Sequence, residues 1–325
     1  MDSDNEKERS HFDKWVDLKP EFIKRYTDLL GEEGFNCFND YSNRYIRKSI
    51  RVNTLKISVK DLKKRLEPEW NLEQIPWCKE GFWITYRQGK RFDIGNLPEH
   101  QLGYIYVQDA ASMLPPVVLK PEPGALLLDT CAAPGSKTSQ AAAYMKNTGL
   151  IIANDMQGKR LSSLGINLQR CGVHNTIITK MDGTRILKQG EGFDFVMVDA
   201  PCSGTGTIRR NPKISSMWSP GLVKRMVRDQ RKLAFHGFKL LKPGGVMVYS
   251  TCTLEPEENE GIVSDLLDMF ENAELLDITL DINRSPVVVE FDGRVYNSEV
   301  YKCLRIYPQD NDSEGFFVAK IRKKI

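Results

Sequence analysis

The chain has 325 residues, of which 41% are hydrophobic and 27% are charged, and its formal net charge is +3. This composition is typical of a soluble globular protein. It excludes helical membrane spans, because no segment approaches the ~18–20 consecutive apolar residues that a spanning helix needs. The first residues, MDSDNEKERSHFDKW, are too charged for the apolar core of a secretion signal. We therefore expect a cytoplasmic protein without a membrane partner.

Residues 1–108 are predicted to form a small basic α+β module. The segment PEFIKRYTDLLGEEGF predicts a helix that ends at Gly31, and SVKDLKKRLE predicts a second helix with Ser58 as its N-cap. The runs RYIRKSIRVNTLKI and GFWITY, rich in β-branched and aromatic residues, predict strands. Residues 44–91 carry 13 Lys and Arg against 5 Asp and Glu, a balance that suits a phosphate backbone.

Residues 109–325 are predicted to form an α/β domain on a parallel sheet. Five apolar runs, ALLLD, GLIIAND, NTIITKMD, FDFVMVDAP and GGVMVYSTC, alternate with helical stretches, as parallel strands buried on both faces do. Ligands of such sheets bind beyond the carboxyl ends of the strands. Each run ends in a polar or reactive residue, and we expect one shared site built from Asp129, Cys131, Asp155, Asp182, Asp199, Cys202 and Cys252. Helix capping by carboxylates would explain one or two of these residues but not the cysteines.

The seven cysteines are scattered and include no C-x-x-C pair. Neither a disulfide framework nor a zinc site is predicted, and no metal is expected. Free cysteine usually packs as a small hydrophobe, and we expect this of Cys37, Cys78, Cys171 and Cys303. Packing and reactivity are evenly balanced for Cys202 taken alone, and its place at a strand end beside Asp199 favours reactivity.

The segment DTCAAPGSKT, residues 129–138, joins a strand to a helix through small residues. Backbone N–H groups and a helix N-terminus can therefore approach a ligand carboxylate. The segment has neither the GxxxxGK[ST] nor the GxGxxG spacing of phosphate loops, and Asp155 at the end of the next strand suits a ribose diol. A nucleoside with an amino-acid tail fits these features, which points to S-adenosylmethionine as the cofactor.

The motifs RVNTLK (51–56), DTCAAPGSKT, DAPCSGTG and YSTCTLEPEENE together resemble the RNA cytosine-5 methyltransferases of the Nol1/Nop2/Sun family. The resemblance covers residues 45–322 and is greatest to tRNA enzymes of the archaeal Trm4 type. It implies a Rossmann-like class I methyltransferase sheet over residues 109–325, with residues 1–108 as an RNA-binding module. The usual family loop is CAAPGGKT, and Ser136 here replaces its second glycine. The implied cofactor residues are Cys131, Ala132, Ala133, Pro134, Gly135, Ser136, Lys137, Asp155, Arg160, Asp182 and Asp199.

Methylation of cytosine at carbon 5 explains the need for cysteine. The carbon becomes nucleophilic only after a thiolate adds to carbon 6. Ionisation of the thiol needs a helix N-terminus, a nearby cation or a polar site, and Lys137 is the candidate cation. In the DNA enzymes the cysteine after proline attacks, which would be Cys202. The resemblance to the RNA enzymes instead implies attack by Cys252, breakdown of the adduct assisted by Cys202, and a hydrogen bond from the cytosine edge to Asp199.

The target cytosine must be single-stranded or flipped out to reach such a site. Two basic segments could hold the RNA backbone, one at residues 44–53 and one around Arg209, Arg210 and Lys213. A solvated protein surface is the alternative explanation for such runs. The candidate RNA contacts are Arg44, Arg47, Lys48, Arg51, Asn53, Arg209, Arg210 and Lys213.

The expected substrate is tRNA, because the chain lacks the long extra domains of several ribosomal RNA enzymes. Methylation of ribosomal RNA is the alternative within the same chemistry. A non-catalytic RNA-binding or assembly factor on this fold is the alternative of another class. No protein partner is indicated, and a monomer is expected.

Overall fold

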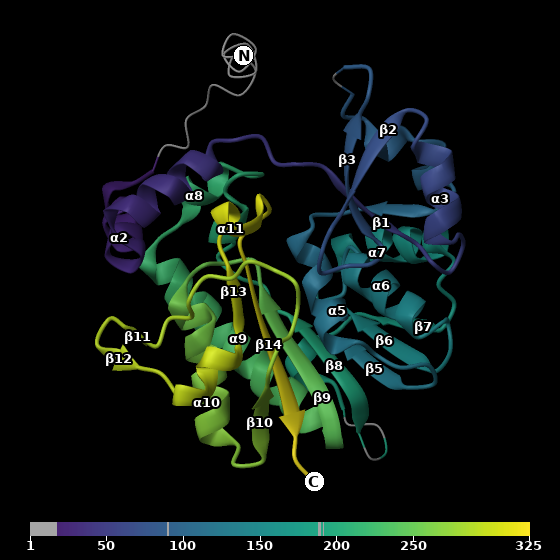
Figure 1. Ribbon diagram of the computed structural model, residues 1–325. Helices are drawn as coiled ribbons and strands as arrows, with labels where there is room; N and C mark the ends of the chain where they lie inside the picture. The colour runs from purple at the N-terminus through teal and green to yellow at the C-terminus, as the bar shows by residue number, and fades with distance from the viewer. Residues whose placement is uncertain (1–17, 90, 188–189, 191) are drawn as a thin grey trace.

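A computed structural model describes residues 18–89, 91–187, 190 and 192–325. The charged segment MDSDNEKERSHFDKW, from which the absence of a secretion signal is expected, lies outside the described residues. Two sheets organise the chain, a four-stranded sheet near the N-terminus and an eight-stranded sheet that follows (Figure 1). None of the described helices is both long enough and apolar enough to cross a membrane.

The first sheet has the strand order β2-β3-β1-β4 and is antiparallel throughout. Its strands are β1 (Ser49–Val52), β2 (Trp70–Gln74), β3 (Gly81–Tyr86) and β4 (Ile105–Val107), and helices α3 (Val59–Leu66) and α4 (Pro98–Gln101) lie between them. Ser58 caps α3 as predicted, since its side chain accepts a hydrogen bond from Asp61 N at 3.1 Å. The predicted strand GFWITY is β3, whereas only four residues of RYIRKSIRVNTLKI pair as β1.

Helix α2 (Pro20–Ser42) does not pack on the first sheet. Its backbone leaves the helical region at Gly31 (φ 72°), as predicted, but helix then resumes and continues to Ser42. Phe22, Tyr26 and Phe38 instead form a buried cluster with Trp218 and Leu254 of the second half of the chain. The N-terminal helix is therefore part of the surroundings of the larger sheet.

The eight-stranded sheet has the order β10-β14-β9-β8-β5-β6-β7, with β13 beside β14. The five runs predicted as parallel strands are parallel neighbours in the sheet. They are β5 (Leu126–Asp129), β6 (Leu150–Asn154), β7 (Thr176–Thr179), β8 (Phe193–Asp199) and β9 (Leu241–Thr251). The antiparallel side was not predicted, and it consists of β10 (Ala273–Leu276), β13 (Leu304–Ile306) and β14 (Phe316–Lys323). A separate short hairpin pairs β11 (Glu290–Phe291) with β12 (Arg294–Val295).

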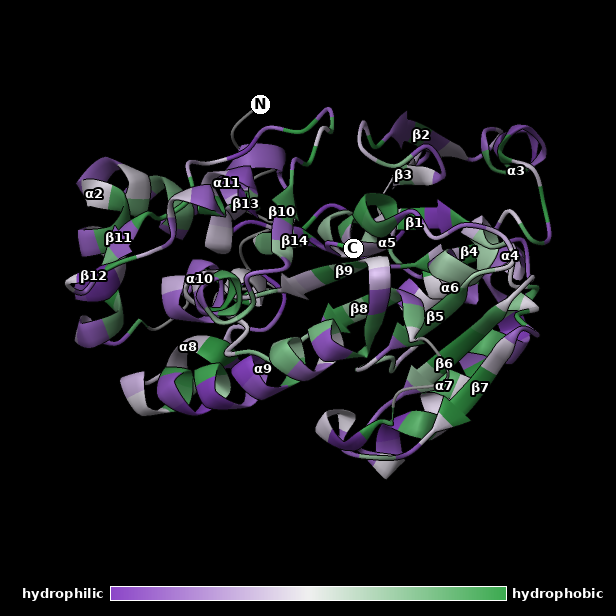
Figure 2. Cartoon of the chain, turned by 90° about the horizontal axis from the view of Figure 1, so that it is seen from below, coloured by the Kyte–Doolittle hydropathy of each residue, from purple (hydrophilic) through white to green (hydrophobic). Residues whose placement is uncertain are grey.

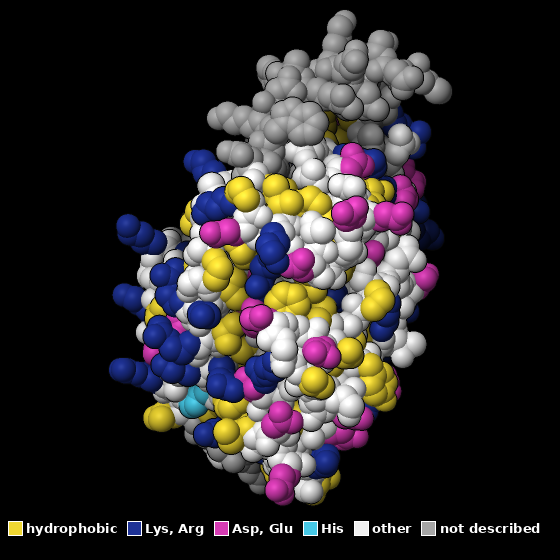
Figure 3. Space-filling view, turned by 90° about the vertical axis from the view of Figure 1, so that its left-hand side faces the viewer, with side chains coloured by type: hydrophobic (Ala, Val, Ile, Leu, Met, Phe, Trp, Pro, Cys, Tyr) yellow, Lys and Arg dark blue, Asp and Glu magenta, His cyan; other side chains and the backbone are white. Residues whose placement is uncertain are grey.

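Helices cover both faces of this sheet, and its central strands are hydrophobic (Figure 2). Adjacent strand residues alternate between two buried clusters, with Leu127 and Met197 in one and Leu128 and Val196 in the other. This alternation is what a strand buried on both faces requires. The helices are α5 (Leu114–Leu119), α6 (Ser136–Tyr144), α7 (Gly158–Cys171), α8 (Lys213–Met217), α9 (Pro220–Leu240), α10 (Glu260–Met269) and α11 (Pro308–Asn311). Lys and Arg side chains gather along one edge of the face shown in Figure 3, on the side where α9 lies.

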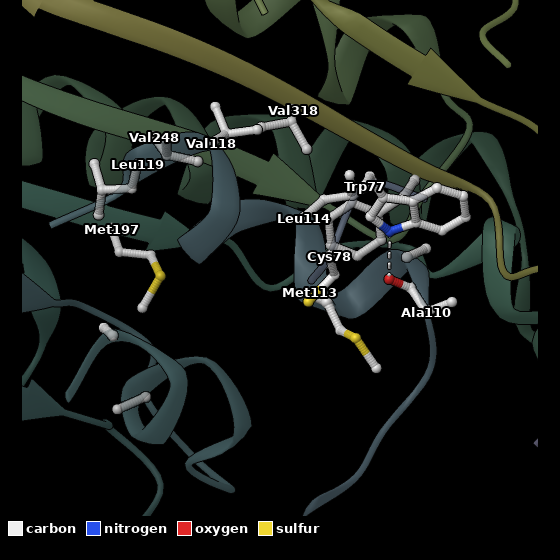
Figure 4. Packing of buried hydrophobic residues seen from close by; sticks show 14 of the residues in the cluster. Trp77, Cys78, Ala110, Met113, Leu114, Val118, Leu119, Met197, Val248 and Val318 are labelled. Carbon is white, nitrogen blue, oxygen red and sulfur yellow. Dashed lines mark hydrogen bonds between the residues drawn. The ribbon is translucent and has the colours of Figure 1, made fainter. Parts of the chain in front are cut away.

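The first sheet is joined to the core of the larger domain by Trp77 and Cys78. Both residues pack beside Met113 and Leu114 at the start of α5, and Trp77 Nε1 donates to Ala110 O at 3.0 Å (Figure 4). Cys78, Cys171 and Cys303 are buried, which fits the packing role predicted for them. The same prediction is wrong for Cys37, which is exposed on α2.

Candidate active site

The loops after β5, β8 and β9 bring four predicted catalytic side chains together. Lys137 Nζ lies 2.8 Å from Asp199 Oδ2, and Ser250 Oγ donates to the other carboxylate oxygen at 2.9 Å. The Sγ atoms of Cys202 and Cys252 are 3.3 Å apart. The carboxyl ends of neighbouring parallel strands lie at one edge of a sheet, which explains how residues 137, 199, 202 and 252 meet.

The two thiols differ in their electrostatic surroundings. We assign Cys202 as the hydrogen-bond donor to Cys252, and this bond lowers the pKa of Cys252 against the opposing effect of burial. The Asp199 carboxylate also raises the pKa of Cys252, whereas the cations of Lys137 and Arg210 lower it. The pKa of Cys202 is raised well above its usual value by the hydrogen bond to Cys252, by burial and by the nearby Glu258 carboxyl. Cys252 is thus the thiol that ionises more readily.

Lys137 is held at the start of α6. Gly135 caps this helix with φ 102°, a conformation that favours glycine, and Lys137 occupies the first turn. Burial alone would lower the pKa of Lys137, but the Asp199 carboxylate outweighs burial and the pKa is raised. Its ammonium group also donates to Ser112 Oγ at 3.2 Å. The lysine is therefore a fixed cation beside Asp199.

The small-residue segment 131–137 consists of the loop after β5 and the first two residues of α6, and it lies beside the end of β6. Asp155 accepts a hydrogen bond from Ala133 N at 3.3 Å and pairs with Arg160 at 3.3 Å. Arg160 also donates to Ala133 O. Asp182 caps a short turn by accepting from Thr184 N, so the capping explanation holds for this residue while its side chain stays 42% exposed. Burial raises the pKa of Cys131 to about 12, which disfavours a thiolate there.

The hydrogen-bond partners of the Asp129 carboxyl show how well this region fits a cofactor. The residue is buried and its Oδ2 accepts from Thr138, but its Oδ1 has no partner among the described residues. Burial raises the pKa of Asp129 to about 7. A buried carboxyl oxygen without a partner is costly, and a ligand with hydrogen-bond donors or positive charge would satisfy it. A cationic amino-acid nucleoside fits this part of the site. No three His, Cys, Asp or Glu side chains cluster as a metal site would require within the described ranges.

Comparison with known proteins decides the family. Residues 116–322 match the family model described as 16S rRNA methyltransferase RsmB/F, and residues 18–110 match that of the N-terminal domain of 16S rRNA methyltransferase RsmF. The chain belongs to the RsmB/F family. It is therefore an RNA methyltransferase of a family that uses S-adenosylmethionine, as the motifs predicted.

Two curated relatives of the chain differ in length. The tRNA (cytosine(49)-C(5))-methyltransferase of Pyrococcus abyssi is 46% identical over 318 residues, which is 95% of this chain and 99% of the relative. The ribosomal RNA small subunit methyltransferase F of Aliivibrio fischeri is 45% identical over 285 residues, which is 86% of this chain and 58% of the relative. The chain spans less than two thirds of the length of this ribosomal RNA enzyme.

Solved structures confirm the Rossmann-like methyltransferase fold with its N-terminal domain. A methyltransferase homolog from Pyrococcus horikoshii has a TM-score of 0.84 at 39% identity and covers 97% of this chain and 99% of its own. NSun6 from Pyrococcus horikoshii, solved with SFG, has a TM-score of 0.82 at 26% identity, and the match covers 94% of this chain and 98% of NSun6. SFG is an analogue of S-adenosylmethionine.

Three of the predicted RNA contacts of this RsmB/F protein are wrong, because they are buried inside it. Arg51 is 2% exposed and donates to Gln108, Ser136 O and Ser139. Asn53 is 1% exposed and donates to two backbone carbonyls. Arg209 pairs with Asp312 and donates to Arg44 O. These side chains hold the first sheet and the Cys202 loop in place.

The remaining candidates lie closer to the surface. Arg44 and Lys213 are exposed, and Arg47 and Lys48 are half-buried. Arg210 keeps 62% of its side chain exposed while its Nε lies 2.9 Å from Glu314. These five residues stay predictions as RNA contacts.

Sequence reasoning missed several residues at the site. Ser250 stands two positions before Cys252 in YSTC and is the one that the motif could have revealed. Ser112 carries no sequence signal. The backbone N of Glu314, whose carboxyl is buried, donates to the half-buried Asp109 carboxyl at 3.4 Å although the two residues are 205 positions apart. Burial raises the pKa of both groups.

Proposed function

We propose that this protein methylates carbon 5 of cytosine in tRNA. The observation that carries the proposal is the pair of thiols 3.3 Å apart, one of them beside the Lys137–Asp199 ion pair. A cysteine that ionises easily next to one that keeps its proton suits a reaction in which one sulfur attacks and the other serves the later proton transfer.

In the proposed mechanism the Cys252 thiolate adds to carbon 6 of the cytosine. Asp199 accepts a hydrogen bond from the cytosine edge, and Lys137 stabilises negative charge near the sulfur and the ring. Bound S-adenosylmethionine supplies the methyl group that carbon 5 receives. Residues 131–137, with Asp155, Arg160, Asp182 and Asp199, hold this cofactor.

Release follows methyl transfer. A base removes the proton from carbon 5, and the electron pair of that C–H bond restores the ring double bond as the bond from carbon 6 to Cys252 breaks. Cys202 assists this elimination. The proposal is supported by its place 3.3 Å from Cys252, where its sulfur faces the same adduct.

tRNA is proposed over ribosomal RNA because the relative matched over 99% of its length is named a tRNA enzyme. Ribosomal RNA is the second candidate, since the relatives named methyltransferase F are about as similar within the shared region. In this proposal residues 1–108 and the side chains of Arg44, Arg47, Lys48, Arg210 and Lys213 contact the RNA. The enzyme acts as a cytoplasmic monomer.

The test is transfer of a labelled methyl group from S-adenosylmethionine to unmodified tRNA transcripts and to 16S ribosomal RNA. We expect label in tRNA and a single protected cytosine after bisulfite sequencing. The Cys252→Ala variant is the control and should give no label. Label in ribosomal RNA alone would favour the second candidate. No label in either RNA would favour a non-catalytic RNA-binding factor.

A further inference from the structure

A chain of four hydroxyl groups runs directly behind the two cysteines. Ser203 Oγ lies 2.6 Å from Thr253 Oγ1, and Thr253 Oγ1 lies 3.0 Å from Thr205 Oγ1. The Tyr26 hydroxyl lies 2.8 Å from Thr205 Oγ1 and 2.8 Å from Glu255 Oε1. All five side chains are buried.

The chain of hydroxyl groups connects three segments that are distant in sequence. Ser203 and Thr205 follow Cys202, Thr253 and Glu255 follow Cys252, and Tyr26 belongs to α2. Two backbone bonds join the same loops, from Gly206 N to Cys252 O at 3.0 Å and from Leu254 N to Thr205 Oγ1 at 2.9 Å. The separation of the two sulfurs is therefore set by side chains beyond the cysteines.

Helix α2 holds the far end of this chain. Arg25 lies beside Tyr26 and contacts the Glu255 carboxylate, with Nε at 2.7 Å, and Trp218 Nε1 donates to the same carboxylate at 2.8 Å. A buried carboxylate with three donors is strongly fixed, because loss of a neutral donor leaves a buried oxygen short of a hydrogen bond and loss of Arg25 leaves the charge unpaired. The hydroxyl chain is thus tied to a rigid end.

We propose that Tyr26 is a positioning residue that keeps Cys202 and Cys252 in hydrogen-bond contact through Thr205 and Thr253. The N-terminal helix is then part of the catalytic machinery, although it touches neither cysteine. A displacement of about 1 Å in one loop would break a sulfur contact of this length, and misplacements of that size cost about 10²-fold in rate. This inference rests on the proposed roles of the two cysteines.

The test compares Tyr26→Phe with Tyr296→Phe in the full chain. Tyr296 is also buried, but its hydroxyl has no partner among the described residues. The Tyr296→Phe variant therefore loses a buried hydroxyl and leaves the series of hydrogen-bonded hydroxyls intact. We expect Tyr26→Phe to lower kcat by about 10- to 100-fold with KM for RNA within about 2-fold of wild type. The acidic limb of its pH profile should move to higher pH. Thr205→Val should act in the same direction.

A second measurement needs no RNA. Alkylation of Cys252 by iodoacetamide at neutral pH, read by mass spectrometry, reports the thiolate fraction of that residue. We expect slower alkylation in Tyr26→Phe than in wild type and Tyr296→Phe. Equal alkylation rates and equal kcat in the two variants would overturn the proposal. If wild type transfers no methyl group, the proposed function fails, while the alkylation rates still decide the role of Tyr26.

A second surface carries an independent inference. Helix α9 bears six exposed basic residues, and at about 100° per residue they fall within a stripe of about 120°. This stripe consists of Lys224, Arg225, Arg228, Arg231, Lys232 and Lys239. Arg228 pairs with Asp229 and Arg231 with Asp265. Basic side chains gather along the corresponding edge of the surface in Figure 3.

We infer that the α9 stripe binds the phosphate backbone of the RNA outside the active site. It runs about 22 Å along the helix from Lys224 to Lys239. The opposite face of α9 packs in the core through Leu233, Ala234 and Phe238, so no apolar face is free to enter a membrane. In the middle of α9, the buried Gln230 donates to Pro201 O at 2.9 Å, which joins the helix to the Cys202 loop. Because α9 connects the carboxyl end of β8 to the start of the parallel strand β9, its Lys224 end lies at the edge of the sheet that carries the site, and RNA on the stripe would approach the site at that end.

The salt dependence of tRNA binding, measured without cofactor, tests this surface. Lys224→Gln/Lys232→Gln should reduce the slope of log K against log salt by about two. The matched control is Lys120→Gln/Lys146→Gln, two exposed lysines on other elements, which should leave the slope unchanged. An unchanged slope in the first variant, or an equal change in both, would overturn the inference. Binding is read independently of methyl transfer, so a failure of the proposed function does not hide the result.

Discussion

The loops that carry Cys202 and Cys252 occupy equivalent positions in the fold, but the two cysteines have different surroundings. Each follows one of two neighbouring parallel strands, β8 and β9, and each cysteine is partly exposed. The hydrogen bond from Cys202, helped by Lys137 and Arg210, lowers the pKa of Cys252 against burial and the Asp199 carboxylate. The same bond, burial and the Glu258 carboxyl raise the pKa of Cys202. Equivalent places in the fold can therefore support different chemical roles, and the direction of the hydrogen bond between the thiols together with the charges around each thiol makes the difference.

Removal of the attacking sulfur should have the largest effect. Cys252→Ala should abolish methyl transfer and also prevent any covalent complex with RNA, because the remaining thiol, Cys202, has a raised pKa and keeps its proton. Labelled methyl transfer and denaturing gels of protein with RNA measure both outcomes. A covalent complex that persists in this variant would reverse the roles of the two cysteines.

Removal of the other sulfur should separate attack from release. Cys202→Ala should form the adduct but accumulate it, so that turnover falls by at least about 10²-fold while a covalent complex appears. Because Cys202 also lowers the pKa of Cys252, adduct formation should be slower at pH 7 than at pH 8.5. Mass spectrometry of the complex checks this, and normal turnover without a trapped complex would contradict it.

Removal of the Lys137 cation should reduce the difference in pKa between Cys252 and Cys202. Lys137→Met removes a positive charge that lowers the pKa of Cys252, so that pKa should rise and the active thiolate should form only at higher pH. We expect kcat/KM at pH 7 to fall about 10²- to 10³-fold, with partial recovery above pH 8.5. The exposed Lys146→Met is the control in the pH–rate profile. A lowered profile of unchanged shape would mean that Lys137 does not act on the thiol.

The smallest effect is expected at Ser250. Its hydroxyl holds one oxygen of Asp199 at 2.9 Å, and a hydrogen bond to a charged group contributes about 1.5–3 kcal/mol. Ser250→Ala should therefore reduce kcat/KM about 10- to 100-fold without trapping RNA. Single-turnover kinetics check this, and accumulation of a covalent complex would place Ser250 on the release side with Cys202.

The sequence predicted the parallel strands and the meeting of their ends because both follow from local patterns. Apolar runs of four to seven residues identify buried strands, and the residue after each run lies at the carboxyl edge. The buried basic residues could not be predicted in this way. Arg51 and Arg209 belong to basic runs that look like surface, but their partners, Ser139 and Asp312, are distant in sequence.

The sequence by itself determined the family, the parallel strands of the larger sheet and the residues that meet at their carboxyl ends, because motifs and strand periodicity are properties of short segments. The tertiary structure decided which basic residues are exposed, where α2 packs and how Tyr26, Thr205 and Thr253 connect the two loops. It also decided which thiol ionises more readily, since a pKa depends on burial and on charges brought close from other parts of the chain.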